Sequence, residues 1–117
     1  MSRGEIWFVQ LPTDPPEKGR RPVLVVSLDA RNHAARATTV LVVPLSTTPA
    51  RFETQIDIPP GETGLSEPST LRCEDITTIR KTSLVSPRVP LRRLGEARMR
   101  QVATAVQAAL GFPKASR

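Results

Sequence analysis

The stretch RRPVLVVS, residues 20–27, joins two arginines and a proline to four apolar residues in a row. Its apolar part, VLVV at 23–26, occurs a second time at 40–43. Both runs are short and rich in β-branched valine, which is typical of buried strands. They predict two neighbouring strands at the centre of a small β structure, joined by a polar segment that carries turn residues.

Further strands are expected on both sides of this pair. The segment 4–11 is apolar and β-prone, and it ends in a loop rich in proline and glycine. The segment 53–58 alternates strictly between polar and apolar residues, as a half-buried strand does. The pattern predicts another strand at 70–79, with a bulge after Cys73, and a short one at 87–91.

The C-terminal part has the period of a helix. It begins after Gly95, an acceptable N-cap, and is expected to end at Gly111 and Pro113. The apolar stripe predicted to face the core comprises Met99, Val102, Ala103, Val106, Ala109 and Leu110. The fold class expected is therefore mostly β with a C-terminal helix, in a single domain spanning residues 1–117.

Composition limits the classes of protein to which the chain can belong. Its 117 residues fit one domain, and 38% apolar residues suffice for a packed core. No segment is as long and apolar as a membrane span and no charged-then-apolar leader is present, so we expect a cytoplasmic protein without a membrane partner. Cys73 is the only cysteine and His33 the only histidine, so neither a disulfide, a metal site nor a cofactor is expected.

The net charge of +6 is unevenly distributed. Basic and acidic side chains balance over residues 1–87, whereas residues 88–117 hold seven basic side chains against Glu96 alone. Such a surface favours an anionic partner, either nucleic acid or an acidic peptide. A solvated basic helix without a partner is the alternative interpretation.

Few residues carry recognisable chemistry. No Ser/His/Asp set, HExxH motif or phosphate-binding glycine loop occurs. We expect His33 in an exposed loop and Cys73 as a buried, inert thiol. The remaining candidates are the arginines before the first VLVV strand and the hydroxyl cluster STT (46–48) after the second.

Antiparallel pairing of the two VLVV strands would bring Arg21 and Ser46 to the same edge of the sheet. A guanidinium binds two phosphate oxygens at once, and a neighbouring hydroxyl can donate to the same phosphate. The pair suits phosphodiester chemistry without a metal. A solvated arginine and a simple Ser/Thr turn are the alternative interpretation.

Six motifs in order resemble the MazF/PemK family of toxin–antitoxin toxins, over almost the whole chain. They are RGEIW (3–7), RRPVLVVS (20–27), VVPLSTTP (42–49), GETGL (61–65), CEDITTI (73–79) and AALGF (108–112). The resemblance implies an SH3-like small β-barrel with a C-terminal helix, of the CcdB/MazF type, that forms a homodimer. It also implies a cognate antitoxin whose acidic, disordered tail blocks the RNA site.

The activity implied is a sequence-specific, metal-independent endoribonuclease acting on single-stranded RNA. The family's arginine before proline falls on Arg21, and its catalytic hydroxyl, usually a threonine, falls on Ser46, with Thr47 left open. The 2′-OH of the RNA would attack the adjacent phosphorus and give a 2′,3′-cyclic phosphate and a 5′-hydroxyl, while Arg21 and Ser46 stabilise the phosphoryl charge.

Residues expected to bind RNA are Lys18, Arg20, Thr47, Thr48, Arg51 and Phe52. Among them Phe52 is the candidate for base stacking. Two alternatives from other classes remain at this point. One is a toxin of the same fold that traps a protein target such as gyrase, as CcdB does, and the other is an inactive relative that only binds antitoxin.

Overall fold

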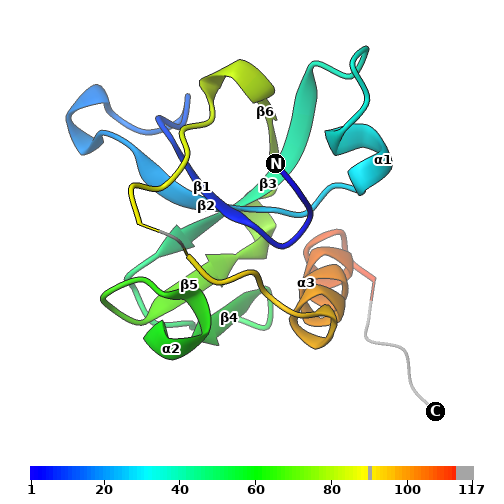
Figure 1. Cartoon of the computed structure of the whole chain (residues 1–117). Helices are drawn as coiled ribbons and strands as arrows, with labels where there is room; N and C mark the ends of the chain where they lie inside the picture. Colours follow the sequence, from blue (N-terminus) through cyan, green and yellow to red (C-terminus); the bar gives the residue numbers. More distant parts are fainter. Residues whose placement is uncertain (90, 113–117) are drawn as a thin grey trace.

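The computed structural model describes residues 1–89 and 91–112, in which antiparallel strands pack against a C-terminal helix (Figure 1). The strands are β1 (Ile6–Val9), β2 (Arg21–Val25), β3 (Thr39–Ser46), β4 (Gln55–Ile58), β5 (Ser69–Arg72) and β6 (Thr77–Arg80). The α-helices are α1 (Asp29–Asn32), α2 (Pro60–Thr63) and α3 (Glu96–Ala109). Single turns of 3-10 helix cover Pro16–Lys18, Cys73–Asp75 and Lys81–Ser83. The predicted fold class, mostly β with a C-terminal helix, is confirmed.

β3 is the strand on which the sheet is built. Its N-terminal half pairs with β6, its middle with β2 and its last two residues with β5, always antiparallel. β1 extends the sheet beyond β2, and β4 extends it beyond β5. The C-terminal end of β3 therefore lies between β2 and β5.

The two VLVV runs are continuously apolar because both faces of their strands are buried. In β2, Leu24 belongs to one hydrophobic cluster while Val23 and Val25 belong to a second one. In β3, Val43 lies in the first cluster and Val42 in the second. All five side chains are fully buried. A shift of β2 on β3 by one residue would exchange the two sets of side chains between the clusters.

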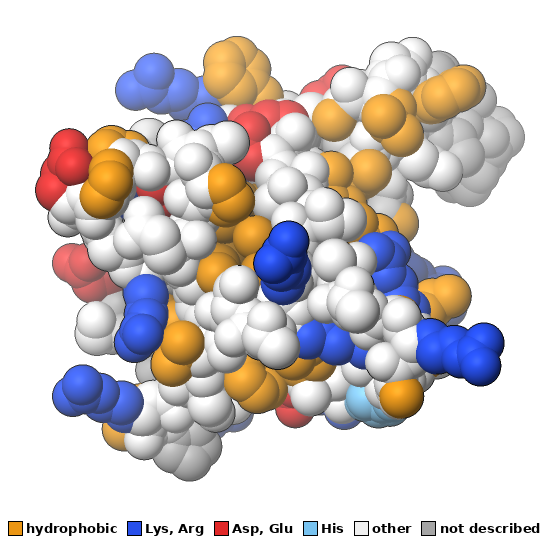
Figure 2. All heavy atoms as spheres, turned by 90° about the horizontal axis from the view of Figure 1, so that it is seen from above, with side chains coloured by type: hydrophobic (Ala, Val, Ile, Leu, Met, Phe, Trp, Pro, Cys, Tyr) orange, Lys and Arg blue, Asp and Glu red, His pale blue; other side chains and the backbone are white. Residues whose placement is uncertain are grey.

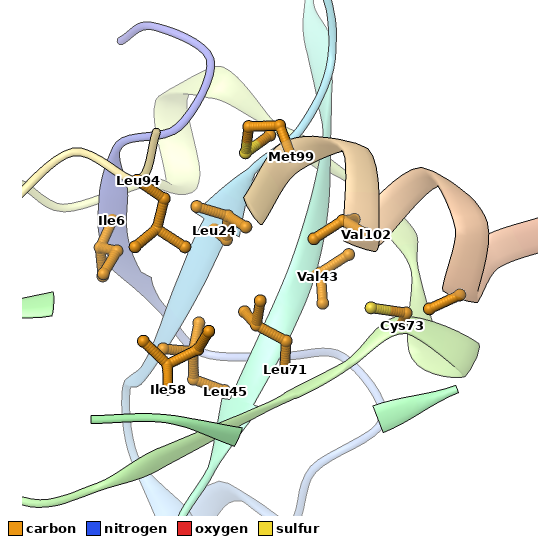
Figure 3. Close-up of a cluster of buried hydrophobic side chains, with 11 residues drawn as sticks. Ile6, Leu24, Val43, Leu45, Ile58, Leu71, Cys73, Leu94, Met99 and Val102 are labelled. Carbon is orange, nitrogen blue, oxygen red and sulfur yellow. The ribbon is translucent and has the colours of Figure 1, made fainter. Parts of the chain in front are cut away.

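α3 covers the first cluster (Figure 3). Its buried residues are Met99, Val102 and Ala105. The predicted stripe is right for the first two and for Val106, which is partly buried against the same cluster. It is wrong for three residues that are exposed, Ala103, Ala109 and Leu110. Consecutive helical residues lie about 100° apart, so Ala103 is turned away from the face centred on Val102. Ala109 and Leu110 lie more than one turn beyond Ala105, the last buried residue of the helix.

The strand predicted at 70–79 is in fact two strands, β5 and β6, separated by the 3-10 turn at Cys73–Asp75. β5 pairs with the end of β3 and β6 with its start, so the chain must step along β3 between them. The turn makes this step in place of the predicted bulge. The strand predicted at 87–91 is not formed at 87–89 or at Leu91, where prolines remove backbone donors. Pro90 and Pro113 lie outside the described residues.

Candidate active site

Arg21 and Ser46 lie at the same edge of the sheet. Val23 pairs with Pro44, so the first residue of β2 and the last residue of β3 come together. Both residues line a pocket of about 260 Å³. Its full lining is Lys18, Arg21, Pro22, Leu45, Ser46, Thr47 and Ser69. This pocket is the candidate active site, and we call it the active-site pocket.

Arg21 is held in place by two neighbours. Its Nη1 lies 3.3 Å from each carboxylate oxygen of Asp14, and its Nη2 donates to the carbonyl oxygen of Leu45 at 2.9 Å. The side chains of Arg21 and Asp14 are 20% and 11% exposed. A guanidinium has five N–H donors, so this anchoring leaves donors for a ligand in the pocket.

The Ser46 hydroxyl has a structural role and a free hydrogen. Its Oγ accepts a hydrogen bond from the backbone N–H of Thr48 at 3.1 Å, so the Ser/Thr turn of the alternative interpretation is present. Accepting this bond does not use the hydroxyl hydrogen, which can still be donated into the pocket. Thr47 lines the same pocket, so the geometry keeps both hydroxyls as candidates.

Sequence reasoning missed two residues at this site. Asp14 lies in the proline-rich loop between β1 and β2, where nothing in the sequence ties it to Arg21. Ser69 opens β5, whose next residue, Thr70, pairs with Ser46 across the sheet. Ser69 is only 6% exposed and lines the active-site pocket. Both residues reach the site through strand pairing and loop packing, which a single sequence does not specify.

The residues predicted to bind RNA are divided among three places. Lys18, at the end of a 3-10 turn, lines the active-site pocket and gives it a second cation. Arg20 is exposed beside the pocket but is not part of its lining. Thr48, Arg51 and Phe52 line a separate pocket of about 170 Å³, formed by the residues that follow Ser46 and Thr47.

Several C-terminal arginines are engaged in ion pairs. Arg98 Nε donates to Glu62 Oε2 at 2.8 Å, and this bond lowers the pKa of the Glu62 carboxyl and raises the pKa of Arg98. Arg93 lies 3.6 Å from Asp29. Over the face seen in Figure 2, basic side chains are scattered among uncharged atoms rather than gathered in one patch. The basic excess at 88–117 is thus partly balanced by acids from elsewhere in the chain.

Other candidates for chemistry lie away from the pocket. Cys73 is fully buried in the first cluster, and burial raises the pKa of its thiol to about 12, as expected for an inert cysteine. His33 is exposed, with its Nε2 3.1 Å from Ser2 Oγ. Among residues 1–89 and 91–112, no three His, Cys, Asp or Glu side chains are grouped as a metal site would require. None of the helices in these ranges is long and apolar enough to cross a membrane.

Comparison with solved structures finds the same fold in other proteins. An endoribonuclease from a mycobacterial species, in complex with its cognate antitoxin, is 27% identical, with a TM-score of 0.75 over 98% of this chain and 99% of that chain. Another structure of a mycobacterial endoribonuclease is also 27% identical, with a TM-score of 0.74 over 98% and 95% of the two chains. MazF from Deinococcus radiodurans, at 16% identity, shares the fold with a TM-score of 0.70 over 96% and 97%.

No curated protein matches the chain. A family model does match, over residues 2–110, and it describes the PemK-like, MazF-like toxins of type II toxin–antitoxin systems. The match spans both strands and the loop that form the active-site pocket, as well as α3. The chain therefore belongs to the PemK/MazF family of toxins.

Proposed function

We propose that this protein is an endoribonuclease toxin that cleaves single-stranded RNA, without a metal ion, at the active-site pocket. The proposal rests on one observation: Arg21 and Ser46 line the same pocket, and Lys18 adds a second cation to it. Two neighbours of the same fold at 27% identity are endoribonucleases. A phosphate fits this donor set, because arginine and hydroxyl groups can bond its oxygens together.

The reaction uses the RNA as its own nucleophile. The 2′-oxygen forms a bond to the adjacent phosphorus and the bond from phosphorus to the 5′-oxygen breaks, giving a 2′,3′-cyclic phosphate and a 5′-hydroxyl. The 2′-OH loses its proton and the leaving 5′-oxygen gains one. Arg21 stays charged at neutral pH, so its role is to donate hydrogen bonds to the phosphoryl oxygens as their charge grows. Ser46 adds a second donor from the opposite strand.

The surrounding residues hold the RNA on either side of the cut. Lys18 and Arg20 contact phosphates beside the scissile one, and such contacts make binding dependent on salt. Thr47 and Thr48 follow Ser46 along the loop and bond to the RNA backbone. Arg51 and Phe52 extend the binding surface beyond this loop, and Phe52, which is 66% exposed, offers a stacking face.

The protein acts as a homodimer in the cytoplasm, with residues 1–117 forming one toxin domain. Leu28, Leu110 and Phe112 are at least 64% exposed, and a dimer contact would cover such apolar groups. A cognate antitoxin with an acidic tail inhibits it, in line with the neighbour that is complexed with its cognate antitoxin. Light scattering at micromolar protein concentration measures the mass in solution. We expect the mass of a dimer, and the mass of a monomer would contradict this part of the proposal.

The test of the activity is incubation of the pure protein with a long single-stranded RNA in EDTA. We expect cleavage at a restricted set of sites, with products whose 5′ ends accept phosphate from a polynucleotide kinase. A protein that cleaves no RNA but inhibits gyrase, or that only binds antitoxin, would belong to one of the alternative classes. Cleavage that requires a divalent metal would contradict the proposed chemistry.

A further inference from the structure

A second small pocket is lined by the residues that directly follow the hydroxyls of the active-site pocket. Ser46 and Thr47 line the active-site pocket, and the next two residues, Thr48 and Pro49, line this one. Its full lining is Thr48, Pro49, Arg51, Phe52, Gln55 and Arg72. Its volume of about 170 Å³ equals roughly six water molecules, which is well below the size of a drug-sized ligand site. It suits a single flat ring.

One wall of this pocket is aromatic and exposed. Phe52 is 66% exposed although a phenyl group is strongly apolar. Proteins that bind single-stranded nucleic acid place aromatic rings in this way, because every base has a face on which to stack. The pocket thus offers a stacking surface directly beside the cleavage loop.

The polar side of the pocket is held rigidly. Gln55 Oε1 accepts a hydrogen bond from the backbone N–H of Arg51 at 3.0 Å, and Gln55 Nε2 donates to Glu74 Oε2 at 2.7 Å. These two bonds fix which end of the amide is oxygen and which is nitrogen. One amide hydrogen of Gln55 remains for a ligand.

Arg72 brings further donors to the same pocket. Its Nε lies 3.2 Å from Asp75 and its Nη2 lies 3.5 Å from Glu74. The Nε atom is nevertheless buried without a hydrogen-bond partner among the described residues. A ligand in the pocket cannot reach the buried Nε, so the donors that Arg72 offers to it are the N–H groups of its two terminal nitrogens. Arg51 adds a second guanidinium at the rim.

We propose that this pocket binds one nucleobase next to the scissile phosphate, with Phe52 as the stacking platform and Gln55 and Arg72 as residues that determine specificity. Their free groups are hydrogen-bond donors, so the site favours bases with a carbonyl oxygen at the recognition edge, guanine or uracil, over adenine and cytosine, which present an amino group there. The inference rests on the proposed function, which supplies RNA as the substrate.

The experiment compares oligoribonucleotides that carry a mapped cleavage site and each of the four bases at every position flanking the cut. For the wild-type protein we expect kcat/KM to be at least about tenfold higher for guanine or uracil at one of these positions, as one specific base contact provides. Gln55→Leu should reduce this preference to about twofold or less by removing the amide that reads the base edge. Preferences at the other positions should stay unchanged, and Gln107→Leu, the same substitution at an exposed residue of α3, should keep the wild-type pattern.

Two further measurements separate recognition from a general effect on the loop. Phe52→Leu should lower kcat/KM for all four bases by a similar factor, because stacking tolerates any base. Replacing guanine with 2-aminopurine, which lacks the carbonyl oxygen, should reduce cleavage by the unaltered protein. The inference is contradicted if wild-type cleavage shows no preference for guanine or uracil, or if Gln55→Leu changes every position equally. Absence of wild-type cleavage contradicts the proposed function itself.

Discussion

Arg21 is both a structural and a catalytic residue in the proposed scheme, and a pair of variants separates the two roles. Arg21→Ala leaves Asp14, whose side chain is 11% exposed, without its cation. Breaking a fully buried ion pair costs about 3–5 kcal/mol and breaking an exposed one about 0–1 kcal/mol. The Arg21–Asp14 pair is partly buried, with a contact of 3.3 Å, and so falls between these limits. We therefore expect Arg21→Ala to lower the free energy of unfolding by about 2 kcal/mol. For a domain of this size that lowers Tm by about 8 °C.

The two variants should differ in stability but not in their loss of cleavage activity. Loss of one transition-state donor lowers the rate by about 10²–10³. The double variant Arg21→Ala/Asp14→Ala removes the unpaired carboxylate as well, so it should regain most of the lost stability without regaining activity. Urea unfolding followed by the fluorescence of Trp7, the only tryptophan, gives the stability, and initial rates on single-stranded RNA in EDTA give the activity. Recovery of cleavage together with stability would show that Arg21 acts only on the fold.

Other predictions concern single groups. Ser46→Ala should lower the cleavage rate at least about tenfold and Ser46→Thr should retain it, whereas a large loss in Thr47→Ala with none in Ser46→Ala would assign catalysis to the neighbouring hydroxyl. Cys73, with a thiol pKa of about 12 and no exposed surface, should react with a thiol reagent only after unfolding, and labelling of the native protein would contradict its burial. Arg98 holds the pKa of Glu62 below its ordinary value of 4.5 in the folded state, so the pair stabilises the fold above that pH and the contribution is lost as the pH falls through the lower folded value. The difference in free energy of unfolding between the wild type and Glu62→Gln should therefore shrink on acidification, and a difference that grows would contradict the ion pair.

The sequence predicts the centre of the fold well because two-sided burial leaves a clear pattern. The VLVV runs indicate two adjacent buried strands, and their antiparallel pairing is enough to bring Arg21 and Ser46 to one edge. The helix is also predicted, since a long amphipathic segment carries its own period. The buried face of the helix is not predicted correctly. Ala103 and Ala105 have the same side chain, and only the packing of the helix on the core determines that Ala105 is the buried one.

The parts that were not predicted depend on contacts between distant segments. α1 and α2 have four residues each and are too short to leave a helical pattern. Asp14 reaches Arg21 only through the fold of the β1–β2 loop. Gln55 and Arg72 meet because β4 pairs with β5, where they are direct partners in the register. No spacing in the sequence marks these pairs as neighbours.

Cleavage by the 2′-OH of the RNA can be tested with a single substitution in the substrate. An oligoribonucleotide with a mapped cleavage site is compared with the same oligonucleotide carrying one 2′-deoxynucleotide on the 5′ side of the scissile phosphate, both in EDTA. We expect the wild-type protein to bind both with similar affinity, to cleave the all-ribose strand to a 2′,3′-cyclic phosphate, and to leave the substituted strand intact. Cleavage of the 2′-deoxy strand at the same bond would contradict the proposed reaction.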